Sequence, residues 1–260
     1  MKNFLSIDQG TTSSRSIIFD ANLNLVTDAQ EEYDLTYPED GWVELEPKKI
    51  VETVTNTLNK VVSADIGLEA CGITNQRETT IVWSKATGEA IYPGIVWQDR
   101  RTHEYCSYLK SNGHEPAIKE KTGLLLDPYF SATKIKWILD NVDGAREKAS
   151  KGELLFGTVD SYLIYMLSKE KNHFTDVTNA SRTLLFNIKS MEWDDELLEL
   201  FEIPKTMMPE VLSCDGDFGN LKINDCEIPI RGVIGDQQAA LVGQGCFNNG
   251  DMKATYGTGC

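Results

Sequence analysis

Alternating runs of apolar and polar positions predict three short strands at the N-terminus. Apolar side chains gather in residues 4–7, 16–20 and 23–26, and the turn-forming pair Ala21-Asn22 separates the last two runs. Short apolar runs bounded by turn residues are typical of strands. The sequence therefore predicts a three-stranded meander.

A helical pattern follows this meander. Pro47 stands at the first-turn position that proline favours, and Ile50, Val54, Leu58 and Val61 recur at steps of three and four residues. This spacing places the four apolar side chains on one helical face. The predicted order is then β-β-β-α.

Strand-like and helix-like segments alternate through the rest of the chain. We expect strands at residues 70–73, 80–83 and 229–234, and helices at residues 101–110, 131–141, 160–168 and 236–243. No internal repeat, low-complexity tract or flexible linker interrupts them. Such alternation predicts an α/β layered domain.

Composition and charge narrow the classes of partner. The 260 residues are 41% hydrophobic and 25% charged, as in an ordinary globular protein, and 25 basic against 40 acidic residues give a net charge of -15. This negative charge argues against sequence-independent binding to nucleic acid or to anionic lipid.

The sequence shows no targeting or membrane-spanning segment. The stretch before Asp8, residues 1–7, is too short to form a signal peptide, and no apolar run is long enough to span a membrane. We therefore expect a cytoplasmic protein without membrane insertion.

The cysteines indicate neither zinc nor disulfides. The six are scattered, no Cys-x-x-Cys pair occurs, and only three histidines are available as further ligands. Free structural thiols are the usual state in a reducing compartment.

The segment from Asp8 to Arg15 is the first candidate for chemistry. It carries a carboxylate, then Gly10, then the hydroxyls of Thr11, Thr12, Ser13 and Ser14, between two strand-like runs. Backbone N–H groups and hydroxyls of such a turn can converge on a phosphate. Asp8 would add an oxygen ligand suited to Mg²⁺. The alternative is a polar hairpin turn without a ligand.

Further polar blocks accompany this segment. They are residues 8–15 (DQGTTSSR), 75–79 (NQRET), 97–101 (WQDRR), 235–240 (GDQQAA) and 255–260 (TYGTGC), together with residues 129–137 (YFSATKIKW). The first five resemble glycerol kinase blocks in their order, and the last resembles the signature of the wider FGGY carbohydrate-kinase family. The resemblance extends from end to end of the chain.

This resemblance implies a fold and a division of the chain. The fold would be α/β, an actin-like ATPase or ribonuclease H-like domain, with a mixed sheet that starts with a β-β-β meander and helices on both faces. Residues 1–247 would form the N-terminal FGGY domain, and residues 248–260 would begin a truncated C-terminal domain.

The resemblance also implies ATP-dependent phosphorylation of glycerol to sn-glycerol 3-phosphate, with ATP and Mg²⁺ as cofactors. Catalysis would require closure against the missing C-terminal domain, so we expect little or no activity from residues 1–260 alone. The full-length protein would be a homo-oligomer. The segment 215–225 lacks a Gly/Arg-rich loop and a histidine, so we expect neither fructose bisphosphate inhibition nor histidine phosphorylation there.

The matching positions imply residue roles. Asp236 would be the catalytic base. The glycerol site would comprise Arg77, Glu78, Trp97, Tyr129, Asp236 and Gln237; the nucleotide phosphates would contact Thr11, Thr12, Ser13, Arg15, Gly257 and Thr258; and Asp8 and Asp236 would organise Mg²⁺. Trp137 is assigned to the core.

Each role has a structural alternative. Arg77 and Glu78 could form an exposed loop ion pair, Trp97 and Tyr129 could be core residues, and Asp236 could be a helix N-cap. For the whole chain, the alternatives are a kinase for another small polyol or ketose and a non-enzymatic actin-like ATPase module.

Overall fold

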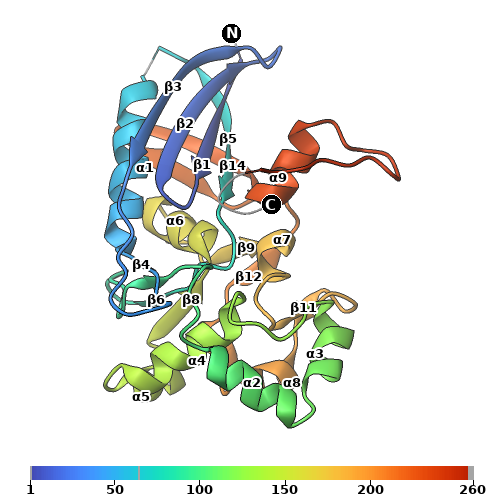
Figure 1. Cartoon of the computed structure of the whole chain (residues 1–260). Helices are drawn as coiled ribbons and strands as arrows, with labels where there is room; N and C mark the ends of the chain where they lie inside the picture. Colours follow the sequence, from blue (N-terminus) through green and yellow to red (C-terminus); the bar gives the residue numbers. More distant parts are fainter. Residues whose placement is uncertain (1, 64, 257–260) are drawn as a thin grey trace.

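A computed structural model describes residues 2–63 and 65–256 of the chain and places a six-stranded mixed sheet at one end of the molecule (Figure 1). The strands lie in the order β13 (Asn220–Ile223), β14 (Cys226–Gly235), β5 (Leu68–Asn75), β1 (Asn3–Gln9), β2 (Ser13–Asp20) and β3 (Leu25–Glu32). Strands β14, β5 and β1 run parallel, and β13, β2 and β3 are antiparallel to their neighbours. The mixed sheet of an α/β domain is therefore as expected.

The N-terminal meander is confirmed, but the bounds predicted for its third strand are wrong. Leu23 lies in a turn with φ of 63° rather than in a strand. The carboxylate of Asp20 accepts hydrogen bonds from the backbone N–H groups of Asn22 and Asn24, which keeps these residues in the turn. The strand begins at Leu25, and its polar second half, where exposed and half-buried residues alternate, carried no apolar signal.

Two helices cover one face of the sheet. Helix α1 (Pro47–Val61) buries Ile50, Val54 and Leu58, as the spacing predicted, and α6 (Val159–Leu167) packs beside it. Residues 3, 5, 7 and 9 of β1 are buried, whereas Phe4 and Asp8 on the opposite face are exposed. This first hydrophobic core lies between the sheet and the two helices.

A second core lies at the other end of the molecule, where Figure 1 shows α2, α4, α5 and α8 together. Its helices are α2 (His103–Ser111), α3 (Glu115–Thr122), α4 (Ser131–Asn141), α5 (Ala145–Ser150) and α8 (Asp195–Leu200), with the 3-10 turn η1 (Lys205–Met207). The described residues also form four two-stranded pairs: β4 (Glu44–Leu45) with β7 (Gly94–Ile95), β6 (Ile81–Ser84) with β8 (Leu154–Gly157), β9 (Phe174–Asp176) with β12 (Glu210–Leu212), and β10 (Phe186–Asn187) with β11 (Glu192–Trp193). Helices α7 (Val177–Ala180) and α9 (Asp236–Gly243) lie near the carboxyl end of β14.

Several other expectations can be compared with this structure. The predicted helices at residues 131–141 and 236–243 coincide with α4 and α9. Cys71, Cys106, Cys214, Cys226 and Cys246 are free thiols, and Cys260 lies outside the described residues. Among the described helices, none combines the length and apolar character needed to cross a bilayer.

Candidate functional site

Three parallel strands end at the same edge of the sheet and carry the predicted site residues to it. Gln9 of β1 and Gly235 of β14 both pair with Asn75 of β5, which lies between them. Carboxyl ends of parallel strands in α/β sheets are the usual place for ligands. The topology therefore brings Asp8, the Arg77-Glu78 pair and Asp236 together, although more than 150 residues separate the last two segments.

The turn between β1 and β2 is closed by a backbone hydrogen bond of 2.8 Å from Gly10 N–H to the carbonyl of Ser13. Thr12 at its tip is exposed, and Thr11 Oγ1 accepts a 3.0 Å hydrogen bond from the indole N–H of Trp97. Trp97, a predicted glycerol residue, thus contacts the predicted phosphate turn directly. The turn presents hydroxyls at the surface, as a phosphate site requires.

A buried polar network supports this turn from below. The hydroxyl of Tyr33 donates a 2.6 Å hydrogen bond to the carbonyl of Gly10, and the side-chain amides of Gln9 and Gln76 both donate to the Tyr33 hydroxyl, at 2.6 and 3.1 Å. Burial raises the pKa of Tyr33 to about 12. The sequence patterns contained no signal for Tyr33, which lies beyond the predicted third strand.

Arg15 lies away from the tip of the turn. Its guanidinium forms an ion pair of 2.6 Å with Asp28 on β3, and both side chains remain partly exposed. Arg15 also faces Asp8 across the β1–β2 ladder. A role in binding phosphate would require the guanidinium to leave Asp28, so this assignment stays a prediction.

The charge of Asp236 acts on the carboxyl group of Asp8. Asp8 keeps solvent access, but the protein around its carboxyl displaces part of its water, and this desolvation raises the pKa of Asp8 above its ordinary value. The negative charge of Asp236 raises that pKa further, and Arg15 opposes the shift. A carboxylate whose ionisation is disfavoured by a second carboxylate is part of a donor set that a divalent cation would stabilise. The described residues contain no cluster of three or more His, Cys, Asp and Glu side chains, so phosphate or water oxygens would have to complete such a site.

Asp236 is the first residue of α9, and Gly235 is the N-cap, so the N-cap alternative for Asp236 is wrong. A carboxylate in the first helical turn is still stabilised by the helix dipole. Arg77 Nε lies 3.1 Å from Asp236 Oδ1 as a charge contact whose angle does not make a hydrogen bond. The guanidinium of Arg77 also donates a hydrogen bond of 3.3 Å to the side-chain oxygen of Gln238. One side chain therefore joins the segment that follows β5 to α9.

Glu78 is buried, so the alternative of an exposed loop ion pair is wrong for this residue. Its side chain is 2% exposed, and its backbone adopts the left-handed region with φ of 60°. Such a conformation in a non-glycine residue costs of the order of 1–3 kcal/mol and is common at binding sites. The carbonyl of Glu78 accepts hydrogen bonds from the hydroxyls of Thr80 and Ser131, which stabilises this conformation.

The carboxylate of Glu78 has its shortest charge contact with a residue that sequence reasoning missed. Arg182 Nε donates a 2.6 Å hydrogen bond to Glu78 Oε1, whereas the guanidinium of Arg77 lies 3.9 Å from the same oxygen. Burial raises the pKa of Glu78, and the positive charges of Arg77, Arg182 and Lys134 oppose that shift. Arg182 follows α7, and no motif marked it in the sequence.

Trp97 and Tyr129 form one aromatic pair beside Glu78. Their ring centroids lie 5.5 Å apart at a tilted angle, and both side chains are half-buried rather than enclosed in a core. The carbonyl of Tyr129 accepts a 2.8 Å hydrogen bond from Lys134 Nζ. Lys134 is fully buried, and this burial lowers its pKa to about 7. Within the segment 129–137, a buried lysine therefore holds Tyr129 in place.

Helix α7 connects the Glu78 segment to the start of α9. Asn179 exchanges two 3.0 Å hydrogen bonds with the side-chain amide of Asn75, and Thr178 Oγ1 accepts a 2.8 Å hydrogen bond from Gly235 N–H. Asp176 caps α7 by accepting from the backbone of Thr178 and Asn179. One short helix thus contacts the ends of both β5 and β14.

Gln237 contacts the segment that follows α9. Its Oε1 accepts a 2.5 Å hydrogen bond from Lys253 Nζ and a 3.1 Å hydrogen bond from the hydroxyl of Thr255. The side-chain amide of Gln237, a residue predicted to bind glycerol, is therefore engaged within the chain. Gly257 and Thr258, predicted to contact phosphate, lie outside the described residues.

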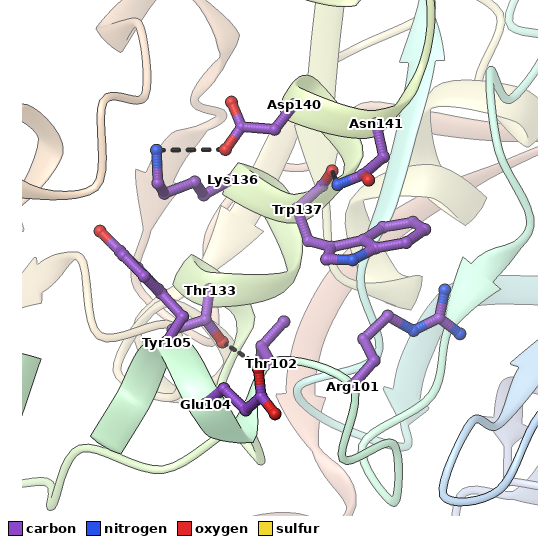
Figure 2. Close-up of a pocket in the computed structure, with 9 residues that line it drawn as sticks. All are labelled: Arg101, Thr102, Glu104, Tyr105, Thr133, Lys136, Trp137, Asp140 and Asn141. Atoms are coloured by element: carbon purple, nitrogen blue, oxygen red, sulfur yellow. Dashed lines mark hydrogen bonds and ion pairs between the residues drawn. The ribbon is translucent and has the colours of Figure 1, made fainter. Parts of the chain in front are cut away.

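Arg101, the last residue of the polar block 97–101, has a structural role. Its fully buried guanidinium forms 2.8 Å ion pairs with Asp99 and Glu44 and stacks between the rings of Trp42 and Trp137. Figure 2 shows a pocket of about 230 Å³ beside it, where α4 carries Lys136 toward Asp140. None of the predicted site residues lines this pocket. Trp137 packs with Arg101 and lines this pocket, so it is half-buried against the second core rather than enclosed in it.

Comparisons with known proteins agree with this geometry. Residues 3–243 match the N-terminal domain of the FGGY family of carbohydrate kinases. Proteins named glycerol kinase from Alteromonas mediterranea and Cereibacter sphaeroides are 58% and 56% identical over the whole of this chain. The match covers 54% of each relative, so the chain spans about half the length of the curated relatives it matches.

Solved structures extend the likeness to the fold. The structure of Plasmodium falciparum glycerol kinase with ADP has a TM-score of 0.91 and 35% identity, covering 95% of this chain and 51% of that one. A xylulose kinase from Lactobacillus acidophilus has a TM-score of 0.82 at 24% identity, covering 94% of this chain and 50% of that one, and supports the fold alone.

Proposed function

The chain belongs to the FGGY family of carbohydrate kinases, and on this basis we propose that it forms the glycerol-binding half of an ATP-dependent glycerol kinase. The product would be sn-glycerol 3-phosphate. The observation that carries this proposal is the convergence of Asp8, Arg77-Glu78 and Asp236 at the carboxyl edge of three parallel strands. More than half of the residues are identical to those of proteins named glycerol kinase, which supports glycerol over another substrate.

We assign the acceptor site to four side chains: Arg77, Glu78, Trp97 and Tyr129. The buried carboxylate of Glu78 accepts hydrogen bonds, and the guanidinium of Arg77 donates them, which together match the hydroxyls of a small polyol. The aromatic pair would cover the carbon skeleton of the ligand. Gln237 would join the site once its amide is released from Lys253 and Thr255.

Asp236 would accept the proton of the attacking hydroxyl. It lies at the amino end of α9 with Arg77 beside it, and both the helix dipole and the guanidinium stabilise its negative charge. Phosphoryl transfer depends mainly on positioning and charge neutralisation, and an ordinary carboxylate aligned with the nucleophile is sufficient as a base.

The turn of Thr11, Thr12 and Ser13 would hold phosphate oxygens of ATP. Asp8 and Asp236 would hold Mg²⁺, a fit supported by the effect of the Asp236 charge on Asp8. When bound, the ion neutralises phosphate charge. Gly257 and Thr258 would contact the nucleotide from the other side, and residues 248–260 would lead into the C-terminal domain. The full-length protein would act in the cytoplasm as a homo-oligomer.

The test uses a chimera in which this chain is followed by the remaining C-terminal part of the 58% identical Alteromonas relative. We expect ATP-dependent phosphorylation of glycerol with a higher kcat/KM than for any pentulose or other polyol in a panel. Residues 1–260 alone should turn over little, because closure of two domains aligns donor and acceptor. Faster turnover of a ketose would move the chain to a sister sugar kinase. ATP hydrolysis that glycerol does not alter would instead favour a non-enzymatic actin-like module.

A further inference from the structure

Arg182 contacts the proposed acceptor site from a part of the chain that has no assigned role. Its Nε lies 2.6 Å from Oε1 of Glu78, and the two side chains are 23% and 2% exposed. An ion pair of this length between largely buried groups is a strong directional contact. Among the described residues, no group donates a hydrogen bond to the second carboxylate oxygen, Oε2, of Glu78.

The same guanidinium also packs against aromatic rings. Its Cζ lies 4.8 Å from the ring centroid of Phe130 and 5.7 Å from that of Tyr129. These distances are within the range of cation–π contacts. Arg182 therefore touches two side chains of the proposed acceptor site, one by charge and one by stacking.

The backbone of Arg182 is fixed to the edge of the sheet. Its N–H donates a 3.0 Å hydrogen bond to the carbonyl of Asn179, and Asn179 exchanges two side-chain hydrogen bonds with Asn75 at the end of β5. Glu78 follows Asn75 by three residues. The ion pair between Arg182 and Glu78 thus closes a short loop of contacts around the end of one strand.

We propose that Arg182 is a positioning residue that holds one carboxylate oxygen of Glu78 and directs the other toward the polyol hydroxyls. This inference rests on the proposed function. Because Arg182 donates to Oε1, Oε2 is the carboxylate oxygen that has no hydrogen-bond donor among the described residues, and it can accept from a ligand hydroxyl. The planar guanidinium is suited to this task because it can pair with Glu78 while stacking on Phe130.

The charges around Glu78 give this role a measurable signature. Burial disfavours the carboxylate, and Arg77, Arg182 and Lys134 are the cations that favour it, with the phenol of Tyr129 nearby. Without Arg182, the pKa of Glu78 should rise, because burial is then less strongly opposed. Arg77 and Lys134 remain in every variant, so a comparison with wild type isolates the contribution of Arg182.

The kinetic test compares Arg182→Met and Arg182→Lys in the chimera. We expect the methionine variant to raise the KM for glycerol by about ten-fold or more, with the KM for ATP nearly unchanged and the lysine variant intermediate. In the methionine variant, glycerol KM should fall as pH rises, because Glu78 then ionises again. The control is Arg231→Met, which removes an exposed pair with Asp217 and should leave both KM values unchanged.

A second test uses this 260-residue chain and does not depend on activity. The side-chain carboxyl carbon of Glu78 is followed by NMR against pH in ¹³C-glutamate-labelled protein, and Glu78→Gln assigns the signal. Arg182→Met should move the midpoint to higher pH, and Arg231→Met should not. If the methionine variant does not fold, the lysine variant tests the positioning role. Lysine lacks the planar guanidinium of arginine, so this variant should still raise the KM for glycerol.

The outcomes separate the two levels of inference. A chimera that phosphorylates glycerol but has the same glycerol KM and Glu78 titration with and without Arg182 would overturn the positioning role alone. A shifted Glu78 titration in a protein that does not phosphorylate glycerol would support the control of Glu78 by Arg182 and refute the substrate.

Discussion

Gly235 leaves open the space that Arg77 occupies. A β-carbon added at Gly235 would lie 2.6 Å from Cδ and 2.9 Å from Cγ of Arg77, in the middle of a side chain that is only 12% exposed. The absence of a side chain at the N-cap of α9 therefore allows Arg77 to pass beside it and reach Asp236.

Gly235→Ala should displace Arg77 and weaken acceptor binding. Overpacking typically costs about 1–3 kcal/mol, so we expect the KM for glycerol in the chimera to rise by about ten-fold. Gly243→Ala at the other end of α9 is the matched control, because no neighbouring group of the described residues lies within 4 Å of the added carbon. Equal effects of the two substitutions would contradict the close approach.

Asp236→Asn should abolish most of the chemical step while preserving the size of the side chain. General bases contribute about 10²–10⁴-fold to rate, so kcat for glycerol phosphorylation should fall by a factor in this range. The exposed Asp143, near the start of α5, provides the control Asp143→Asn, which should retain the kcat of the parent chimera. Near-normal kcat in Asp236→Asn would remove this residue from the base role.

Tyr33→Phe should destabilise the fold and loosen the phosphate turn. The change leaves the carbonyl of Gly10 and the amides of Gln9 and Gln76 without the hydroxyl that joins them. Both amides still donate to the carbonyl of Gly10, so the loss is that of ordinary hydrogen bonds, about 0.5–1.5 kcal/mol for each, which urea unfolding of the 260-residue chain can measure. The exposed Tyr37 serves as the control, since Tyr37→Phe should change the free energy of unfolding by less than about 0.5 kcal/mol. A neutral Tyr33→Phe would show that the network does not stabilise the turn.

His173 should make the stability of the chain depend on pH on the acid side. Its ring is half-buried, with Nε2 2.7 Å from the carbonyl of Phe156, and the loss of solvating water lowers its pKa from 6.5 to about 4. Between these values the unfolded chain binds a proton that the folded chain does not. The free energy of unfolding therefore falls as pH decreases, by up to about 1.4 kcal/mol per pH unit.

The measurement for His173 is urea unfolding at several pH values, with His173→Gln as the variant. The variant should lack this component of the slope, and the exposed His103→Gln should keep it. Parallel slopes for wild type and His173→Gln would show that His173 is not held neutral.

Local patterns predicted the elements where apolar spacing was regular. The bounds of α4 and α9 agree with the periodic segments, and the helix opened by Pro47 buries the expected face. The predicted bounds of the third strand were wrong for two reasons. Asp20 holds a turn before the strand by side-chain hydrogen bonds, and the polar second half of the strand has little burial. Short elements such as α5 and α8 were missed because six residues carry too little periodicity.

By itself, the sequence determined the β-β-β-α start, the polar blocks at the ends of strands and their resemblance to a kinase family, because these are properties of contiguous residues. Tertiary structure decided which of those residues meet. Parallel pairing of β1, β5 and β14 places Asp8 near Asp236, and the fold places Arg182 on Glu78 across 104 positions of sequence. Burial then turns that contact from an ordinary surface pair into a strong one, since removing water strengthens the attraction and makes an unpaired carboxylate costly.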